Sequence, residues 1–343
     1  MQETKLNEAE LTAAGEKLQA IRKALNEVLF GQEKLLDQVI VCLLARGHLL
    51  LEGLPGLGKT ELVRALGAVM GLEAKRIQFT PDLLPGDITG NPMLQEVDGE
   101  RKFVFQPGPL FANLVLADEI NRASPKTQSS LLEAMQEHRV TSMGVRHALP
   151  EPFFVMATQN PIELEGTYPL PEAQLDRFLF KLNIQANGPE VLQRIVQQRR
   201  LGEEAVVSNI LDKGALLALM DLTRKIYLPD VVANYIARLV HGTQPGASKA
   251  AGFVKYGASP RAAIGMASAC RARALLEGRA NASYEDVREI AVPVLQHRLV
   301  LEYHARLEGM TGIKVAEELL AEISAHHDQL PPVVTDRKVG AGQ

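Results

Sequence analysis

The sequence contains little cysteine and no long apolar segment. Its two cysteines, Cys42 and Cys270, lie far apart and do not match the ligand spacing of a zinc site, so we expect both to be buried small apolar side chains. The longest uninterrupted apolar run, residues 39–45, is far shorter than the roughly 18 to 20 residues that cross a bilayer. Residues 1–11 are rich in charge and lack the apolar stretch of a secretory signal. We therefore expect a cytoplasmic protein with no membrane insertion.

The sequence also lacks an excess of either charge. Lys and Arg number 37 against 41 for Asp and Glu, so a net charge of -4 gives no bulk attraction to nucleic-acid phosphates, and we expect no nucleic-acid partner. Histidines such as His297 have no partner at metal-ligand spacing and are expected to be surface or hydrogen-bonded side chains. With 343 residues and 46% hydrophobic content, the chain is long enough to form the cores of two globular domains.

Along the first half of the chain, short apolar runs alternate with helical or polar stretches. The expected strands are residues 48–52, 76–79, 113–117, 153–158 and 178–182. This alternation predicts an α/β fold in which helices flank a central parallel sheet. Two hairpins are expected to interrupt the sheet, one turning at Asp98-Gly99 and the other at Gly144.

The helical segments divide the chain into four expected parts. Apolar residues recur every three or four positions from Leu11 to Val28, which predicts an amphipathic N-terminal helix. The string Ala186-Asn187-Gly188-Pro189 combines a helix stop with a proline suited to the first turn of a new helix, which indicates a domain boundary. The parts are an N-terminal helix (1–30), an α/β core (31–187), an all-α lid (188–330) and a disordered tail (331–343).

One glycine-rich segment fits the phosphate-binding motif G-x-x-x-x-G-K-[ST] in full. It reads Gly53-Leu54-Pro55-Gly56-Leu57-Gly58-Lys59-Thr60 and lies between an expected strand and a helix that begins near Glu61. Its glycines let backbone N–H groups turn toward phosphates, Lys59 adds a positive charge at the β and γ phosphates, and the Thr60 hydroxyl can ligate Mg²⁺. Because the motif arises by chance in on the order of one chain in a hundred, its position between a strand and a helix favours a real ATP and Mg²⁺ site.

Polar residues end two of the other expected strands. Asp118 and Glu119 follow an apolar run, where Asp118 can hold Mg²⁺ and Glu119 can polarise the attacking water. Asn160 follows another run and offers an amide that can bond both the γ-phosphate and water. Alone, these positions could be a solvated strand end and a turn before Pro161. Together with the phosphate-binding loop, they predict a nucleotide-hydrolysing site.

Four strings resemble the MoxR family of AAA+ ATPases, within the helix-2-insert branch. They occupy residues 78–87, 105–109, 118–123 and 257–262. The order of parts is also similar: a phosphate-binding loop, an acidic strand end, a polar strand end, an Arg-bearing helix and a helical lid with its own Arg. The resemblance implies an AAA+ core with a small helical lid, a ring that we expect to be a hexamer, and ATP-driven maturation or remodelling of other proteins.

The resemblance also implies roles for individual residues. Asn160 matches the first sensor, and Arg261 matches the second sensor, which we expect to project from a helix start at Ser259-Pro260 toward the nucleotide. Arg177 matches the finger that acts on the γ-phosphate of the neighbouring subunit, and the alternative is an ion pair with Asp176 or a nearby carboxylate. The candidate catalytic residues are Glu119, Asn160, Arg177 and Arg261, the metal ligands are Thr60 and Asp118, and the nucleotide-binding residues are Gly53, Pro55, Gly56, Leu57, Gly58, Lys59, Thr60 and Glu61.

The sequence leaves three functions open. The leading one is an ATPase that remodels or assembles a client protein, and the resemblance implies a von Willebrand A domain protein as a partner. The alternatives are the motor subunit of a metal-insertion complex resembling magnesium chelatase and a nucleotide-gated scaffold that turns over too slowly to be a motor. Measured turnover would separate a motor from a scaffold.

Overall fold

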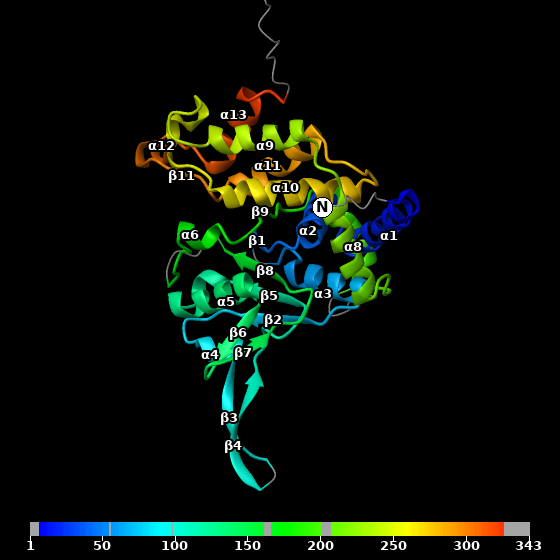
Figure 1. The fold of residues 1–343 in the computed structure, drawn as a ribbon, viewed down its shortest axis with the longest axis vertical. Coiled ribbons are helices and arrows are strands. Elements are labelled where there is room, and N and C mark those ends of the chain that lie inside the picture. Colours follow the sequence, from blue (N-terminus) through cyan, green and yellow to red (C-terminus); the bar gives the residue numbers. More distant parts are fainter. Residues whose placement is uncertain (1–6, 55, 98, 161–165, 201–206, 326–343) are drawn as a thin grey trace, which may run out of the picture.

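The computed structural model describes the chain except residues 1–6, 55, 98, 161–165, 201–206 and 326–343. Helices gather at one end of the molecule, a sheet lies in the middle, and a long hairpin projects from the other end (Figure 1). The expected tail (331–343) lies outside the described residues, and so does Pro55 of the phosphate-binding loop.

The central sheet has five parallel strands, which confirms the predicted α/β fold. In spatial order they are β2 (Ala74–Gln78), β5 (Leu114–Asp118), β8 (Phe154–Gln159), β1 (Leu49–Glu52) and β9 (Phe180–Asn183). Each lies within two residues of its expected position. The three inner strands β5, β8 and β1 are buried, largely apolar runs because both faces of the sheet are covered there. The edge strand β2 is mostly exposed and carries the polar residues Lys75, Arg76 and Gln78.

Two apolar clusters lie on opposite faces of this sheet. Leu49 and Leu51 belong to the first cluster, together with α2 (Glu33–Leu44) and α3 (Lys59–Met70). Leu50 belongs to the second, as side chains alternate along a strand. The second cluster is closed by α4 (Pro85–Thr89) and α5 (Pro125–Glu137), and a short 3₁₀ helix, η1 (Ile120–Arg122), begins two residues after β5.

Both predicted hairpins are present. The longer one pairs β3 (Gly90–Val97) with β4 (Glu100–Pro107) and projects away from the rest of the molecule (Figure 1). The shorter one pairs β6 (Arg139–Ser142) with β7 (Val145–Ala148). Its turn places Met143 at φ 49° and Gly144 at φ 78°, the left-handed pair that a tight two-residue turn requires.

The C-terminal half is helical, as predicted. Its helices are α6 (Glu172–Leu175), α7 (Pro189–Gln198), α8 (Lys213–Lys225), α9 (Asp230–Gly242), η2 (Ala250–Phe253), α10 (Pro260–Leu276), α11 (Tyr284–Leu295), α12 (Tyr303–Leu307) and α13 (Gly312–Glu322). A small antiparallel pair, β10 (Val254–Tyr256) with β11 (Val300–Leu301), was not predicted. Strands of two or three residues are too short to show a period of two.

The N-terminal helix α1 (Glu8–Asn26) joins the two halves. It contacts α2 and α3 of the core and α10 of the lid. Arg22 bonds Asp37 of α2 at 2.6 Å and Glu277, just after α10, at 2.9 Å. The first apolar cluster likewise runs from the sheet into the lid helices. The lid therefore packs on the core through one continuous interior.

Neither thiol is positioned for chemistry. Cys42 and Cys270 are free and buried, as predicted, and burial raises the pKa of both. Among the described residues, no helix is both long and apolar enough to cross a membrane.

His48, the residue before β1, supports a pH-dependent prediction. Its Nε2 donates to Met135 O in α5, and its Nδ1 accepts from Val155 N in β8, both at 3.1 Å. Burial lowers the pKa of His48 to about 4. The unfolded chain therefore binds more protons between about pH 4 and 6.5, so the free energy of unfolding falls as pH falls through that window. The expected loss from pH 7 to pH 5 is about 2 kcal/mol.

Urea titrations at pH 7 and pH 5 check this expectation. A His48→Gln variant keeps a donor and an acceptor but does not titrate, so it should lose about 2 kcal/mol less stability than the wild type over the same interval. Equal losses in the two proteins would contradict the assignment.

Candidate active site

The carboxyl ends of the parallel strands bring the predicted site residues to one edge of the sheet. A cavity of about 410 Å³ opens there. From the predicted set it gathers Gly56, Gly58, Lys59, Thr60, Glu61, Asp118, Glu119 and Asn160. Arg76 and Gln78, both on β2, also line the cavity and were not predicted.

The phosphate-binding loop is shaped by two left-handed glycines. Gly56 has φ 81° and Gly58 has φ 80°, a region that side-chain-bearing residues rarely adopt. Gly58 caps α3, so the positive end of that helix faces the cavity. Lys59 Nζ donates to Gly53 O at 2.6 Å. Burial lowers the pKa of Lys59, whereas the charges of Asp118 and Glu119 raise it. A phosphate beside Lys59 would raise its pKa in the same way as these two carboxylates do and so favour the charged ammonium form.

Asp118 is held by two neighbouring strands. Thr158 of β8 donates to Asp118 Oδ1 at 2.6 Å and accepts from Glu119 N at 2.8 Å. Arg76 of β2 bonds Asp118 Oδ2 at 2.7 Å. Thr158 is fully buried, so it orients both acidic residues from inside the sheet. The sequence signal for Thr158 is its place two residues before Asn160, where the same strand ends.

Glu119 has an unusual backbone and two side-chain partners. Its φ of 57° is uncommon for a residue other than glycine and is typical of strained functional positions. Gln78 Nε2 donates to Glu119 Oε2 at 2.8 Å, and Arg122 NH1 lies 3.2 Å from the same oxygen. Gln78 is the last residue of β2 and pairs in register with Asp118. The Glu119 carboxylate is thus engaged by neutral and cationic donors in this structure.

An apolar cavity of about 480 Å³ adjoins the first one and shares Gly56, Gly58 and Glu61 with it. Its walls include Val28, Leu29, Phe30, Leu57, Leu192 and Ile195. Arg199, just after α7, donates to Val28 O at 3.0 Å, and the Arg194 guanidinium lies 4.6 Å from the centre of the Phe30 ring. Apart from the three shared residues, only Leu57 among the residues named here was predicted to bind the nucleotide.

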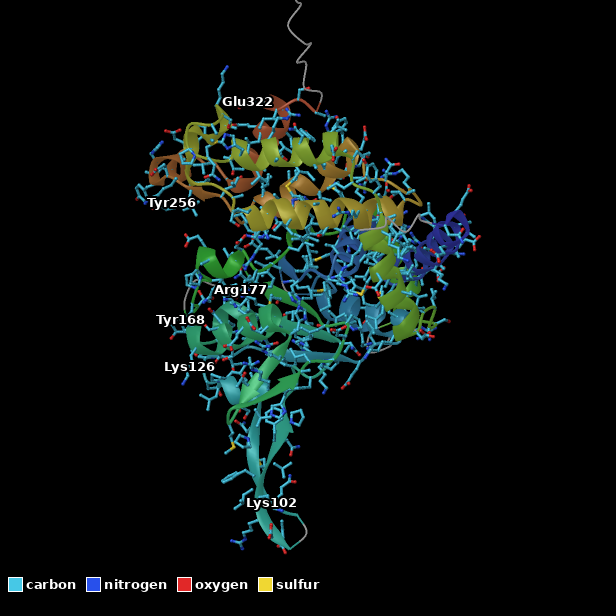
Figure 2. The ribbon with its side chains drawn as sticks, viewed as in Figure 1. Lys102, Lys126, Tyr168, Arg177, Tyr256 and Glu322 are labelled. Atoms are coloured by element: carbon cyan, nitrogen blue, oxygen red, sulfur yellow. The ribbon has the colours of Figure 1, made fainter. Side chains whose placement is uncertain are left out.

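Arg177 lies away from this edge. It lines a separate cavity of about 620 Å³ between α5, the β6–β7 hairpin and α6, and its NH1 donates to Leu132 O at 2.6 Å. In Figure 2 it is on the same side of the molecule as Lys126 and Tyr168. Among the described residues, Asp176 pairs with Arg298 and Arg261, and not with Arg177. The alternative of an Asp176–Arg177 ion pair is therefore not observed.

Arg261 also lies elsewhere. Ser259 caps α10 and Pro260 begins it, as predicted. Arg261 is not among the residues that line the phosphate cavity, and its role as the second sensor stays a prediction. Its guanidinium is half exposed, with NH1 3.8 Å from Asp176 Oδ2. The reason is the packing of the α10 N-terminus beside Asp176, to which Ser259 Oγ donates at 3.1 Å.

His297 is a hydrogen-bonded interior side chain, one of the two expected alternatives. Its Nε2 is 3.0 Å from Phe178 O, and burial lowers its pKa well below the usual value.

Two family models match the chain. The model described as the ATPase family associated with various cellular activities (AAA) covers residues 48–180, and the AAA lid domain model covers residues 247–323. A crystal structure of a putative ATPase from Cytophaga hutchinsonii superposes with a TM-score of 0.86 and is 36% identical, covering 92% of this chain and 97% of that one. The core and lid seen here are thus shared with these proteins.

Three relatives align with most of the length of this chain. Chaperone MoxR1 of Mycobacterium tuberculosis is 43% identical over 302 residues, 87% of this chain and 79% of the relative. Uncharacterized protein YeaC of Bacillus subtilis is 42% identical over 300 residues, with shares of 87% and 92%. Protein MoxR of Paracoccus denitrificans is 31% identical over 309 residues, with shares of 84% and 90%. Because these relatives align with most of the chain and both AAA models match it, the chain belongs to the MoxR family of AAA+ ATPases.

Proposed function

We propose that this protein binds ATP with Mg²⁺ at the carboxyl edge of its sheet, hydrolyses it, and uses the energy to remodel or assemble a client protein. The observation that carries the proposal is one cavity in which Lys59, Asp118, Glu119 and Asn160 meet the N-terminus of α3. The adjoining apolar cavity suits a purine base, which supports a nucleotide over free phosphate.

The donor set fits Mg²⁺ held jointly by protein and nucleotide. The Thr60 hydroxyl and the Asp118 carboxylate are hard oxygen ligands in the same cavity, and few protein ligands suffice where phosphates supply the rest. When bound, Mg²⁺ would neutralise charge on the phosphate oxygens. Arg76 bonds Asp118 here and would have to yield that oxygen to the ion.

The protein groups have distinct roles in this proposal. Lys59 and the N-terminus of α3 bind the phosphates electrostatically. Glu119 accepts a proton from the attacking water once Gln78 or Arg122 releases its carboxylate. Asn160 orients that water with its amide.

A ring assembly completes the site. Neither Arg177, which donates to Leu132 O, nor Arg261, which lies 3.8 Å from Asp176, lines the phosphate cavity of its own chain. Cations in that position can serve a nucleotide bound by the next subunit, which supports a closed ring, with six subunits as the expected number. The name of the M. tuberculosis relative favours a chaperone role over metal insertion. A cytoplasmic location stays a prediction.

Client capture tests the proposal. Glu119→Gln should bind ATP but hardly hydrolyse it. Lys59→Ala loses the charge aimed at the terminal phosphates, so its affinity for ATP, measured by calorimetry, should fall. With ATP present, pull-downs followed by mass spectrometry should enrich the same proteins on Glu119→Gln and not on Lys59→Ala. A von Willebrand A domain protein is the expected first candidate. Equal capture by both variants would refute ATP-dependent client binding, and unchanged affinity in Lys59→Ala would refute the nucleotide site.

A further inference from the structure

Side chains of the lid form hydrogen bonds with the backbone of the segment that carries Arg177. This segment, residues 176–181, leads from Asp176 into β9. Three consecutive residues after α11, which we call the lid turn (residues 296–298), bond its carbonyl oxygens. The contacts are Gln296 to Lys181 O (2.6 Å), His297 to Phe178 O (3.0 Å), and Arg298 to Asp176 O (3.2 Å), Phe178 O (2.6 Å) and Leu179 O (3.1 Å).

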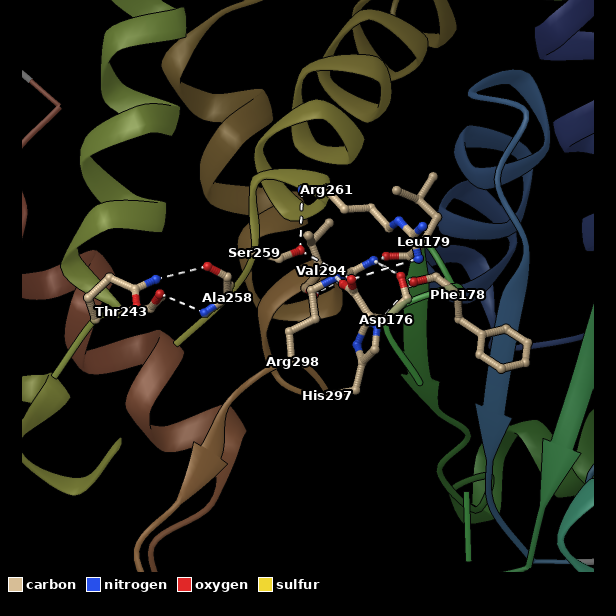
Figure 3. A network of polar contacts seen from close by, with 11 residues as sticks. Asp176, Phe178, Leu179, Thr243, Ala258, Ser259, Arg261, Val294, His297 and Arg298 are labelled. Atoms are coloured by element: carbon tan, nitrogen blue, oxygen red, sulfur yellow. Dashed lines mark hydrogen bonds and ion pairs between the residues drawn. The ribbon is translucent and has the colours of Figure 1, made fainter. Parts of the chain in front are cut away.

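Arg298 is the centre of this contact (Figure 3). Its side chain is only 3% exposed, and its Nε bonds Asp176 Oδ1 at 2.7 Å. With the three carbonyl contacts above and a further bond to Val294 O, every nitrogen of the guanidinium has an acceptor. Lysine has three donors and no planar fork, so it could not make the same set.

A second lid element holds the other oxygen of Asp176. Ser259 Oγ, at the start of α10, donates to Asp176 Oδ2 at 3.1 Å, and Arg261 NH1 lies 3.8 Å from it. With both oxygens engaged by the lid, Asp176 is committed to that side. Arg177, the next residue, extends instead to Leu132 O on the core side.

The same segment also reaches the phosphate-binding loop of its own chain. Phe180 to Asn183 pair in register with β1, which leads into that loop. Lys181 of β9 forms a 2.9 Å ion pair with Glu52, the residue before Gly53. The lid turn therefore contacts a stretch that has Arg177 at one end and a strand next to the loop at the other.

We propose that Arg298 is a positioning residue for Arg177, so that the position of the lid in one subunit sets the placement of the cation offered to the next subunit. The proposal rests on the trans role of Arg177 in the proposed function. Lid movement that shifts the lid turn would displace the backbone of residues 176–179 with it. A displacement of about 1 Å at a catalytic group can cost about 10²-fold in rate.

Arg298→Lys tests the proposal. The substituted side chain would retain a positive charge but lose most of the carbonyl contacts, so kcat should fall about 10²-fold while KM and ATP affinity stay within about twofold. Asp176→Asn, a smaller change at the same contact, should lower kcat in the same direction and covers the case in which Arg298→Lys fails to fold. Arg279→Lys is the matched control, because Arg279 pairs with Asp286 inside the lid, 2.5 Å away, and its loss should lower the melting temperature without changing kcat.

Mixed assemblies separate positioning from general loss of structure. Subunits with Arg298→Lys keep an intact ATP pocket, so adding Lys59→Ala subunits, which offer a correctly held Arg177, should restore part of the turnover. Three outcomes would overturn this inference alone. The first two are a wild-type kcat and a weakened ATP affinity in Arg298→Lys. The third is a mixture of Arg298→Lys with Lys59→Ala that does not recover turnover, although a mixture of Arg177→Ala with Lys59→Ala does. Failure of the Arg177→Ala mixture as well would overturn the trans role and the inference together.

Discussion

Glu119→Gln is expected to lower ATP turnover by about 10²- to 10⁴-fold with little change in ATP affinity, the range typical for removal of a general base. The amide keeps the size of the side chain, and its oxygen can still accept from Gln78 and Arg122. It cannot accept a proton from water at neutral pH. The loss should therefore appear in kcat, measured as phosphate release under saturating ATP.

Glu318→Gln on α13 is a suitable control for this experiment. Glu318 is an exposed glutamate of the lid, away from the sheet edge, and its replacement should leave turnover unchanged. Turnover near the wild-type rate in Glu119→Gln would mean that another group activates the water. A large fall in ATP affinity would instead indicate that Glu119 supports the pocket and not the chemical step.

Arg177→Ala is expected to lower turnover by about 10³- to 10⁵-fold, the effect known for cations that stabilise the transferring phosphoryl group from a neighbouring subunit. Its cavity is separate from the phosphate cavity, so ATP affinity of the same chain should hardly change. Lys126→Ala is the control, since Lys126 is an exposed cation on the same side of the molecule (Figure 2). That variant should lose far less activity.

Subunit mixing decides whether Arg177 acts in trans. Lys59→Ala subunits cannot use their own site but carry an intact Arg177, and Arg177→Ala subunits bind ATP but lack the cation. Each variant alone should be nearly inactive. Mixed rings should regain part of the activity, because some Arg177→Ala sites then border an intact arginine. No recovery, with co-assembly established by light scattering, would contradict a trans role.

Local patterns in the sequence determined the elements and most of the phosphate cavity. The five predicted strands lie within two residues of the observed ones, and the signal is strongest for the inner strands β5, β8 and β1, whose two faces are both buried so that most of their side chains must be apolar. Lys59, Asp118 and Asn160 meet because parallel strands end at one edge, a rule that needs no three-dimensional information. Caps such as Ser259 are equally local, since the bond runs to a backbone two residues away.

The sequence analysis did not predict the residues that contact Asp118 and Glu119 from neighbouring strands. Gln78, Arg76 and Thr158 are ordinary polar residues in strand positions, and their importance arises only from the register that sets β2 and β8 beside β5. The apolar cavity beside the loop was missed for a related reason. Val28 and Leu29 meet Leu192 across more than 150 positions of the chain, a distance over which a sequence pattern carries no information.

The sequence by itself determined the parallel sheet, the phosphate-binding loop and the acidic strand end, because each depends on neighbouring residues or on a short repeat. Only the tertiary structure decided where the side chains of Arg261 and Arg298 lie. A cap and a proline fix where α10 begins, but the direction of Arg261 depends on how that helix packs on Asp176. Arg298 gains its contacts because the lid shares one apolar interior with the core, and that packing brings residue 298 to a backbone some 120 positions earlier.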